Sequence, residues 1–338
     1  MLLLPSANRV YAAASAELAT AELAAFSDSV LRGALPPAAL AELGGVPYLE
    51  FAADGLGPRE TAFLSNISVC YALFELTDGL LRPVELRPLD RYDDDLITIQ
   101  KYPGKTNEQF TKLLLNVTLL ASAFASQMLD RKLAVLDPLC GRGTTLNQAL
   151  MYGYDAAGID LDQRDFDAYV TFIKAWLKRK RIKHKAEYDG PVRREGKVTG
   201  RRLQVSLAAS KDEHNAGQTQ RLDVVCADTT RALEFFRPET IDLIVTDAPY
   251  GVQHGSKTAR GLARRPADLL SAAVPAWARL LRPGGAIGIA LNTFVAPRDP
   301  VTGILAGAGL TPVESGPYRQ FRHRVDQAIM RDIVVARK

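Results

Sequence analysis

The sequence has few cysteines and no long hydrophobic run. Its three cysteines, Cys70, Cys140 and Cys226, lie far apart and form no C-x-x-C pair. This spacing argues against a zinc site or a disulfide framework and favours a reducing, cytoplasmic location. No apolar stretch approaches the roughly 20 residues that a transmembrane helix needs. We therefore expect a protein without a bound metal and without a membrane span.

The net charge is also small, at +4 over 338 residues, but it is unevenly distributed. Residues 174–221 contain 14 Lys and Arg residues against 5 Asp and Glu residues, so the rest of the chain is net negative. A basic segment on an otherwise acidic protein favours an anionic partner, with nucleic acid first. A solvated helix followed by a loop would explain the same run of charge.

The chain from residue 96 to residue 338 has the pattern of an α/β domain. Buried strands are predicted at 133–137, 156–160, 222–228 and 241–247, and helices at 105–129, 144–152, 165–182 and 267–282, with Thr106 as the candidate N-cap of the first helix. Continuous apolar strands with short connections predict a doubly wound, mainly parallel, seven-stranded Rossmann-like sheet. Two antiparallel strands near residue 338 would complete it.

Residues 1–95 differ from the rest and predict a small N-terminal α+β domain. They contain an Ala-rich helical stretch at 11–33 and a strand at 47–51. The segment 64–76 fits a strand and a helix equally well, because β-branched and aromatic residues compete with helical spacing. No motif of catalytic chemistry occurs in this part, which we expect to bind RNA or position the substrate.

A glycine-rich turn, DPLCGRGTT (residues 137–145), follows the first predicted strand of the α/β domain. Doubly wound sheets bind ligands at this point, and Gly141 and Gly143 allow the backbone to approach a ligand closely. The third glycine of a nicotinamide-binding turn is missing. Asp137 suits a positively charged ligand such as S-adenosylmethionine better than a pyrophosphate. A generic strand-to-helix turn is the alternative.

Two further predicted strands also end in carboxylates. Asp160, with Asp162 as its neighbour in GIDLD, follows the glycines by about 20 residues and can accept both hydroxyls of a ribose. Asp228 in CAD can accept a hydrogen bond from an adenine amino group. Each acid alone could be a helix N-cap, but the series predicts a nucleoside-containing cofactor.

The fourth predicted strand ends in DAPYG, residues 247–251. An exocyclic amine of a base is a poor nucleophile because its lone pair is delocalised into the ring. The Asp247 carboxylate and the Ala248 carbonyl can accept its N–H groups and direct the lone pair at a methyl donor. Pro249 stiffens the turn, and Tyr250 offers a face on which a flipped base can stack. The alternative is an ordinary strand exit with a packed tyrosine.

The motifs DPLCGRGTT, GIDLD, CAD, TDAPYG and LLRPGG together resemble those of class I S-adenosylmethionine-dependent methyltransferases. DPLCGRGTT and TDAPYG resemble, more narrowly, the THUMP-associated tRNA guanosine-N2 methyltransferases, and KYPGKTNEQFTKLLLN resembles the segment that covers the methionine end of the cofactor. Ala248 replaces the usual second proline of D-P-P-Y-G, and residues 1–95 contain no recognisable THUMP domain. The resemblance implies that S-adenosyl-L-methionine binds to Thr106, Asn107, Asp137, Leu139, Cys140, Gly141, Gly143, Thr144, Asp160, Leu161, Asp228 and Thr229.

The basic segment predicts a helix followed by a β-hairpin that turns near residues 195–197. With the basic loop 251–265 it would contact nucleic acid through Lys178, Arg179, Lys180, Arg181, Lys183, Lys185, Arg193, Arg194, Arg201, Arg202, Lys257 and Arg260. We expect a methyltransferase that acts on guanosine N2 in tRNA; RNA is favoured because no domain for DNA sequence recognition is recognisable. The alternatives are a DNA adenine-N6 or cytosine-N4 methyltransferase, a small-molecule or peptide methyltransferase, and a non-catalytic nucleic-acid-binding subunit.

Overall fold

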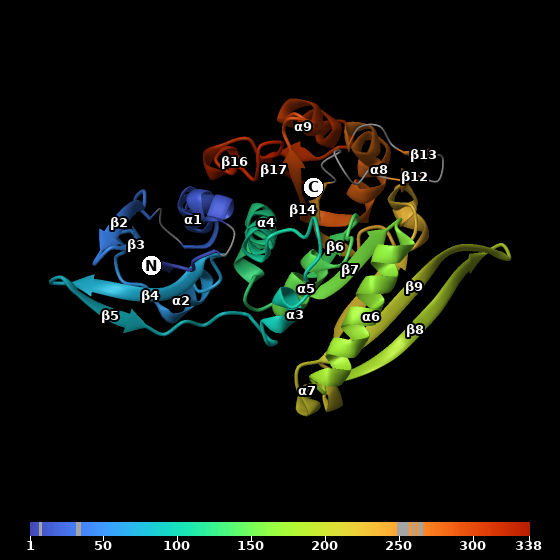
Figure 1. The fold of residues 1–338 in the computed structure, drawn as a ribbon, viewed down its shortest axis with the longest axis horizontal. Coiled ribbons are helices and arrows are strands. Elements are labelled where there is room, and N and C mark those ends of the chain that lie inside the picture. Colours follow the sequence, from blue (N-terminus) through green and yellow to red (C-terminus); the bar gives the residue numbers. More distant parts are fainter. Residues whose placement is uncertain (7–8, 32–34, 249–256, 259–260, 263–265) are drawn as a thin grey trace.

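The computed structural model describes residues 1–6, 9–31, 35–248, 257–258, 261–262 and 266–338. The strands form a small antiparallel sheet near the N-terminus and a much larger central sheet beside it (Figure 1). Among the described residues, no helix combines the length and the apolar composition that a membrane span requires.

The small sheet has the strand order β2-β3-β1-β4-β5. Its strands are β1 (Leu2–Leu3), β2 (Ala39–Leu43), β3 (Val46–Glu50), β4 (Cys70–Thr77) and β5 (Leu80–Val84). The helices α1 (Arg9–Val30) and α2 (Pro58–Leu64) pack in the same core as Leu49 and Leu73, the buried side chains of β3 and β4. The ambiguous segment 64–76 therefore forms a strand from Cys70 onward, and only its first residue, Leu64, belongs to a helix.

The central sheet has ten strands among the described residues, in the order β15-β17-β14-β11-β6-β7-β10-β9-β8, with β16 paired to β17. They are β6 (Ala134–Asp137), β7 (Asp155–Asp160), β8 (Lys183–Arg194), β9 (Lys197–Ala208), β10 (Gln220–Cys226), β11 (Ile241–Asp247), β14 (Leu281–Asn292), β15 (Thr311–Pro312), β16 (His323–Arg324) and β17 (Met330–Arg337). The five strands β14, β11, β6, β7 and β10 are mutually parallel. The predicted Rossmann-like fold class is confirmed.

The sheet is wider than the seven strands that we predicted. The basic hairpin β8–β9 is part of this sheet, because β9 pairs with β10 in antiparallel register from Leu207 opposite Gln220 to Arg201 opposite Cys226. Alternate residues of β9 are buried, so the hairpin extends the hydrophobic face of the sheet. The turn of the hairpin lies at Glu195 and Gly196, which both have positive φ angles (50° and 76°), close to the predicted place.

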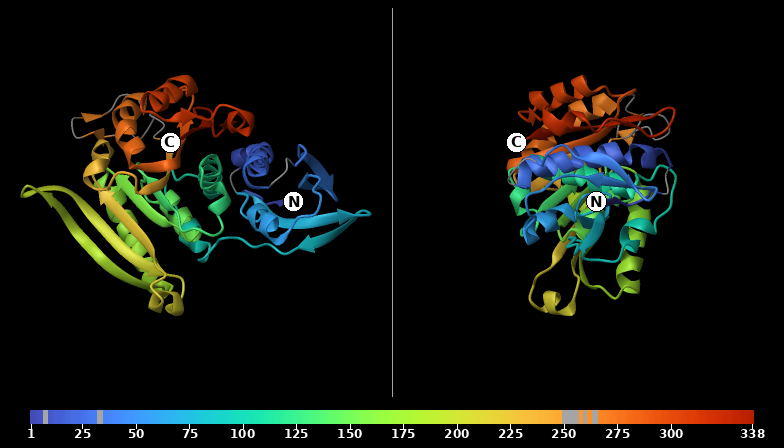
Figure 2. Two further views of the ribbon diagram at one scale, coloured as in Figure 1. Left: turned by 180° about the vertical axis from the view of Figure 1, so that it is seen from behind. Right: turned by 90° about the vertical axis from the view of Figure 1, so that its left-hand side faces the viewer.

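Helices cover both faces of the central sheet (Figures 1 and 2). One face carries α4 (Glu108–Ala121), α5 (Thr144–Met151) and α6 (Gln163–Arg179), and the other carries η2 (Thr229–Glu234), α8 (Pro266–Leu280) and α9 (Arg298–Gly307). The adjacent strand residues Val135 and Leu136 belong to separate cores. Burial on both faces explains why the parallel strands are continuously apolar.

Short elements connect these layers. They are α3 (Asp95–Thr98), η1 (Ala125–Gln127), α7 (Lys211–Asn215), η3 (Gly316–Arg319) and the paired strands β12 (Lys257–Thr258) and β13 (Gly261–Leu262).

The start of α4 differs from the prediction. Its N-cap is Asn107, whose side-chain oxygen accepts a hydrogen bond from Phe110 N at 3.0 Å, and not Thr106. The helix also ends at Ala121, well before residue 129, because Ser122 takes an extended conformation. Since the Asn107 side chain accepts the backbone N–H of Phe110 at the start of the helix, the Thr106 hydroxyl is available for another contact.

A buried carboxylate joins the small sheet's helices to the central fold. Glu22 of α1 is fully buried and accepts hydrogen bonds from Ser68 N (3.1 Å), Ser68 Oγ (2.5 Å) and Asn116 Nδ2 (2.7 Å). Asn116 belongs to α4. Burial raises the pKa of Glu22 to about 7 although these donors favour its charged form.

Candidate active site

Carboxylates follow four neighbouring parallel strands at one edge of the central sheet. In spatial order these are Asp247 at the end of β11, Asp137 at the end of β6, Asp160 at the end of β7 and Asp228 after β10. Along the chain, Asp247 comes last, but the strand order places β11 directly beside β6. The sheet therefore brings the four predicted acids to one edge.

The glycine-rich turn wraps around the end of β6. Gly141 and Gly143 have φ angles of 48° and 78°, in the left-handed region that favours glycine. Gly143 N donates to the Cys140 carbonyl at 2.7 Å, which closes the turn, and Gly141 N donates to Asp160 Oδ2 at 2.7 Å. A side chain at Gly141 would meet nothing within 4 Å, so the backbone here borders open space that a ligand can enter.

The two central acids are held in different ways. Asp160 accepts backbone N–H groups on both oxygens, from Gly141 and, at 2.8 Å, from Asp162. Burial raises its pKa to about 6, although these hydrogen bonds lower it. Asp137 is 3% exposed and accepts from Leu139 N at 3.1 Å. Burial, with a smaller contribution from Asp160, raises the pKa of Asp137 to about 7.

Asp228 is the N-cap of η2. Its Oδ1 atom accepts from both Thr230 N (2.9 Å) and Thr230 Oγ (2.7 Å). Within the part of the chain that the structure describes, no hydrogen bond to Oδ2 is present. Asp228 thus combines the helix-capping role with an open acceptor at the edge of the sheet.

Five more of the residues predicted to bind the cofactor follow the same strands, namely Leu139, Cys140, Thr144, Leu161 and Thr229, whereas Thr106 and Asn107 lie at the start of α4. Thr144 is the first residue of α5, and its hydroxyl lies 3.2 Å from the hydroxyl of Tyr102. Cys140 is buried, and its backbone N–H donates to the carbonyl of Ile159 at 2.9 Å. Thr229 Oγ accepts from Trp277 Nε1 at 3.0 Å, which fixes it to α8.

Asp247, at the start of DAPYG, is contacted by residues from two distant segments. Thr106 Oγ donates to Asp247 Oδ2 at 2.7 Å, and Arg331 Nη2 lies 3.4 Å from the same oxygen. The Arg331 side chain is 6% exposed and its guanidinium stacks on the ring of Phe110, 4.2 Å from the centroid. A hydroxyl and a buried cation therefore orient the predicted catalytic carboxylate.

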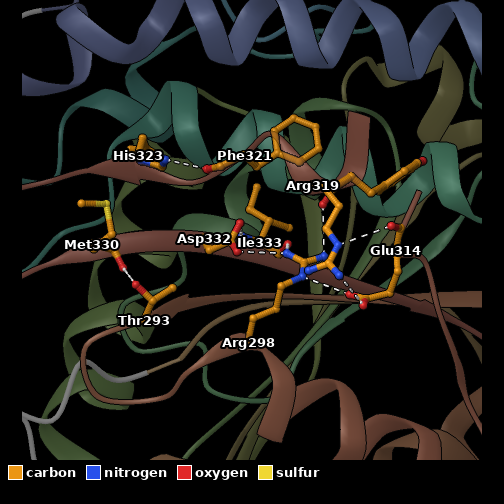
Figure 3. A network of polar contacts seen from close by, with 10 residues as sticks. Thr293, Arg298, Glu314, Arg319, Phe321, His323, Met330, Asp332 and Ile333 are labelled. Atoms are coloured by element: carbon orange, nitrogen blue, oxygen red, sulfur yellow. Dashed lines mark hydrogen bonds and ion pairs between the residues drawn. The ribbon is translucent and has the colours of Figure 1, made fainter. Parts of the chain in front are cut away.

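The strand that carries Arg331 is itself anchored on its opposite face. Asp332 pairs with Arg298, whose Nη1 lies 3.0 Å from Asp332 Oδ2 and 2.8 Å from the Ile333 carbonyl (Figure 3). Arg298 also contacts Glu314. Arg331 and Asp332, which are neighbours in β17, thus each have an ion-pair partner, and the two partners lie on opposite faces of the strand. Arg331 is not among the residues predicted from the sequence, where its signal is an Arg-Asp pair inside an otherwise apolar strand.

Ala248 continues the ladder between β11 and β14. It is 2% exposed, and its N–H donates to the Ala290 carbonyl at 2.9 Å. A proline has no N–H and could not make this bond. The residue that departs from D-P-P-Y-G is therefore accommodated by an added backbone hydrogen bond. Pro249, Tyr250 and Arg260 lie outside the described residues, as does the side chain of Lys257.

The predicted nucleic-acid-binding residues divide into paired and unpaired groups. Ion pairs join Arg179 and Lys180 to Asp95, Arg194 to Glu234, Arg201 to Asp167, and Arg202 to Asp223. Exposed residues without an ion pair to any described carboxylate are Lys178, Arg181, Lys183, Lys185 and Arg193.

The two ends of the hairpin lie near opposite ends of the parallel strands, one at their amino ends and the other at their carboxyl ends. Lys183 pairs with Ala208, near the amino end of β10. Arg193 lies next to the turn, and the turn extends past Arg201, the partner of Cys226 at the carboxyl end of β10. Figure 1 shows the hairpin running along one side of the sheet to a tip well beyond it. Arg193 therefore lies on the side of the sheet where the parallel strands end in acids.

The fold and these strand ends define a methyltransferase of the Rossmann-like class. Residues 113–292 match the family described as "RMKL-like, methyltransferase domain", and the chain belongs to this family. Its methyl donor is S-adenosyl-L-methionine, and the residues at the strand ends fit this group, since open space above Gly141 adjoins carboxylates that can accept ribose and adenine hydrogens.

A comparison with curated protein sequences finds no match. Solved structures with a similar fold include TrmN from Thermus thermophilus, at 18% identity over 76% of this chain and 56% of TrmN, with a TM-score of 0.39. The rRNA methyltransferase aviRa from Streptomyces viridochromogenes shares 13% identity over 73% of this chain and 91% of aviRa, with a TM-score of 0.40. This chain thus spans little more than half the length of TrmN. Likeness at this level carries no argument about the substrate.

Proposed function

We propose that this methyltransferase modifies the exocyclic N2 amine of guanosine in tRNA. The observation that carries the proposal is Asp247, which ends β11, the strand next to β6 and its glycine-rich turn, and has its carboxylate oriented by Thr106 and Arg331. A positioned acceptor beside a donor site suits an amine nucleophile that has to be desolvated and aligned.

The proposed donor site consists of the glycine-rich turn and the next two strand ends. Asp160 would accept the ribose hydroxyls, and Asp228, through Oδ2, would accept the adenine amine. When bound, S-adenosylmethionine supplies an electrophilic methyl group on a sulfonium. The neighbouring carboxylates Asp137 and Asp160 give this edge a negative potential that favours a cationic ligand.

Asp247 and the carbonyl of Ala248 would accept the two N–H groups of the target amine. Accepting both hydrogens favours a tetrahedral nitrogen whose lone pair is no longer delocalised into the ring. The amine loses a proton after transfer, and the Asp247 carboxylate is placed to receive it. Residues 1–95 are proposed to position the RNA, and Tyr250, which follows Asp247 in the sequence, to stack on the base.

An assay with labelled methyl donor tests the proposal. The purified protein is incubated separately with tRNA, rRNA and duplex DNA, and the modified nucleoside is identified by mass after digestion. We expect N2-methylguanosine in the tRNA sample. Label found only as N6-methyladenine or N4-methylcytosine in DNA would replace the proposal by the DNA alternative, and no label in any nucleic acid would refute it.

A further inference from the structure

Arg331, which contacts the Asp247 carboxylate, lies at one end of a row of buried side chains. Its guanidinium lies over the ring of Phe110, with Cζ 4.2 Å from the ring centroid. The Phe110 ring in turn packs against the imidazole of His323, with 5.3 Å between the centroids, and His323 meets the ring of Tyr11 edge to face at 6.1 Å. All four side chains are buried. We call Tyr11, His323 and Phe110 the aromatic row.

The members of the aromatic row come from elements that are far apart in the sequence. Tyr11 belongs to α1 and Phe110 to α4, whereas His323 of β16 is the cross-strand partner of Arg331 in β17. The helix α1 packs against both α4 and β16, and α4 packs against β17. The aromatic row therefore connects the N-terminal helix with the strand that carries the partner of the catalytic carboxylate.

The ring in the middle of the row, His323, is fixed by a hydrogen bond. Its Nδ1 atom lies 2.9 Å from the Phe321 carbonyl (Figure 3). Burial lowers the pKa of His323 to about 4, so the ring is neutral, and Nδ1–H donates to this carbonyl. A neutral ring can pack near the Arg331 cation without repulsion. Because protein interiors are close-packed, a ring that is bonded at one edge and packed between two others transmits a displacement of either neighbour.

Thr106, the other residue that orients the catalytic carboxylate, is also supported by the start of the chain. Asn107 Nδ2 lies 3.4 Å from Ser6 Oγ, and Gln109 Nε2 donates to the Leu4 carbonyl at 3.2 Å. Both donors follow Thr106 closely in the sequence. The N-terminal residues thus support both of the side chains that contact the carboxylate.

We propose that Tyr11 and His323 are positioning residues for methyl transfer, which act through Phe110 and Arg331 on the Asp247 carboxylate. The inference rests on the proposed function for the role of Asp247. It gives the N-terminal helix a part in the chemical step, in addition to contact with RNA. Because the target amine has to be held within a narrow range of geometry, a small displacement of its acceptor lowers the rate of transfer.

The NMR signal of the Arg331 guanidinium tests the connection without a measurement of activity. In protein that contains isotope-labelled arginine, the Nε–Hε signal of Arg331 is identified by its absence in Arg331→Met. Tyr11→Leu and His323→Leu should each shift this signal, because each removes a ring that helps to hold Phe110. The two variants lie in different elements, so one remains informative if the other fails to fold. Phe26→Leu, which shortens another buried aromatic side chain of α1, is the matched control and should leave the signal unchanged.

Steady-state kinetics with tRNA test the consequence for catalysis. His323→Leu should lower kcat about threefold to tenfold, the range that one aromatic pair contributes, with unchanged KM for tRNA and unchanged Kd for S-adenosylhomocysteine. His323→Phe restores a ring at this position and should recover part of the loss. In the Arg331→Met background, His323→Leu should lower kcat no further, because the residue through which it acts is already absent.

The outcomes separate this inference from the function on which it rests. An Arg331 signal that keeps its wild-type position in both leucine variants refutes the connection, whatever the activity. A loss of kcat in His323→Leu that persists in full in the Arg331→Met background also refutes the positioning role, as does an unchanged kcat with lower thermal stability. Wild-type protein that methylates no nucleic acid refutes the proposed function, and the NMR signal then decides the connection by itself.

Discussion

Arg331 Nη2 lies 3.4 Å from Asp247 Oδ2, joining residues 84 positions apart in the sequence. The arginine is 6% exposed and the aspartate 16%, so water screens the pair only weakly. Arg331 also stacks on Phe110 of α4, the helix that follows Thr106. The last strand, β17, and the start of α4 thus meet at the predicted catalytic carboxylate.

Replacing Arg331 by methionine should slow methyl transfer more than it weakens binding. Methionine keeps an apolar contact with Phe110 but removes the cation that orients Asp247. We expect kcat to fall about 10-fold to 100-fold, the range for a hydrogen bond to a charged group, with little change in donor affinity. Arg331→Lys should recover part of the loss. A fall in thermal stability with unchanged kcat would show that Arg331 is only structural.

Substitutions of Asp247 should separate catalysis from donor binding. Asp247→Ala removes the acceptor, and we expect transfer to fall at least about 100-fold while the Kd for S-adenosylhomocysteine stays within about twofold. Asp247→Asn keeps a carbonyl oxygen as acceptor and should retain more activity than the alanine variant. Single-turnover assays and calorimetry measure the two quantities. A large loss of donor affinity would instead assign Asp247 to the donor site.

Local pattern predicted the strand ends well and the contacts between distant segments poorly. The run IDLIVTD predicted β11 with the bounds that the structure has, because a strand buried on both faces is continuously apolar. The pairing of β9 with β10 was not predicted, since polar and charged residues fill the exposed positions of the hairpin. Arg331 was missed for a different reason: its partner is fixed by the order of strands in the sheet, which no local spacing contains.

The effect of alanine at position 248 can be tested by introducing proline, the residue that D-P-P-Y-G has there. Ala248→Pro removes the N–H that donates to the Ala290 carbonyl, so we expect a loss of about 1 kcal/mol in the free energy of unfolding. The Ala248 carbonyl, the proposed acceptor, is kept, so methyl transfer should stay within about threefold of the wild type. Urea denaturation and steady-state kinetics check the two parts. A stability gain would mean that the rigid ring outweighs the lost hydrogen bond.

Glu22 should make the stability of the protein depend on pH. The pKa of Glu22 is about 7 in the folded protein, against about 4.3 for an unfolded glutamate. Between these values the folded state binds more protons, so the free energy of unfolding falls as pH rises from about 4 to 7. Asp137 and Asp160, with pKa values of about 7 and 6, act in the same direction.

Glu22→Gln removes one of these three titrations. The decline in stability between pH 5 and pH 8 should become shallower by about 1–3 kcal/mol in urea titrations. Glu17→Gln, an exposed position on the same helix, is the matched control and should keep the wild-type dependence. An equal decline in the Glu22 variant would mean that the buried carboxylate stays charged at all these pH values.

The two ends of the basic hairpin should contribute unequally to RNA binding. Arg193 lies near the turn, which extends past the carboxyl end of β10, whereas Lys183 lies near the amino end of that strand. Both are exposed and lack an ion pair with the described residues. If RNA approaches the edge that holds Asp247, Arg193→Ala should lower the slope of log affinity against log salt by about 0.7–0.9, the value for one phosphate contact. Lys183→Ala should leave the slope unchanged. Equal effects of both substitutions would mean that RNA follows the whole length of the hairpin, and a larger effect of Lys183→Ala would place the RNA at the other edge of the sheet.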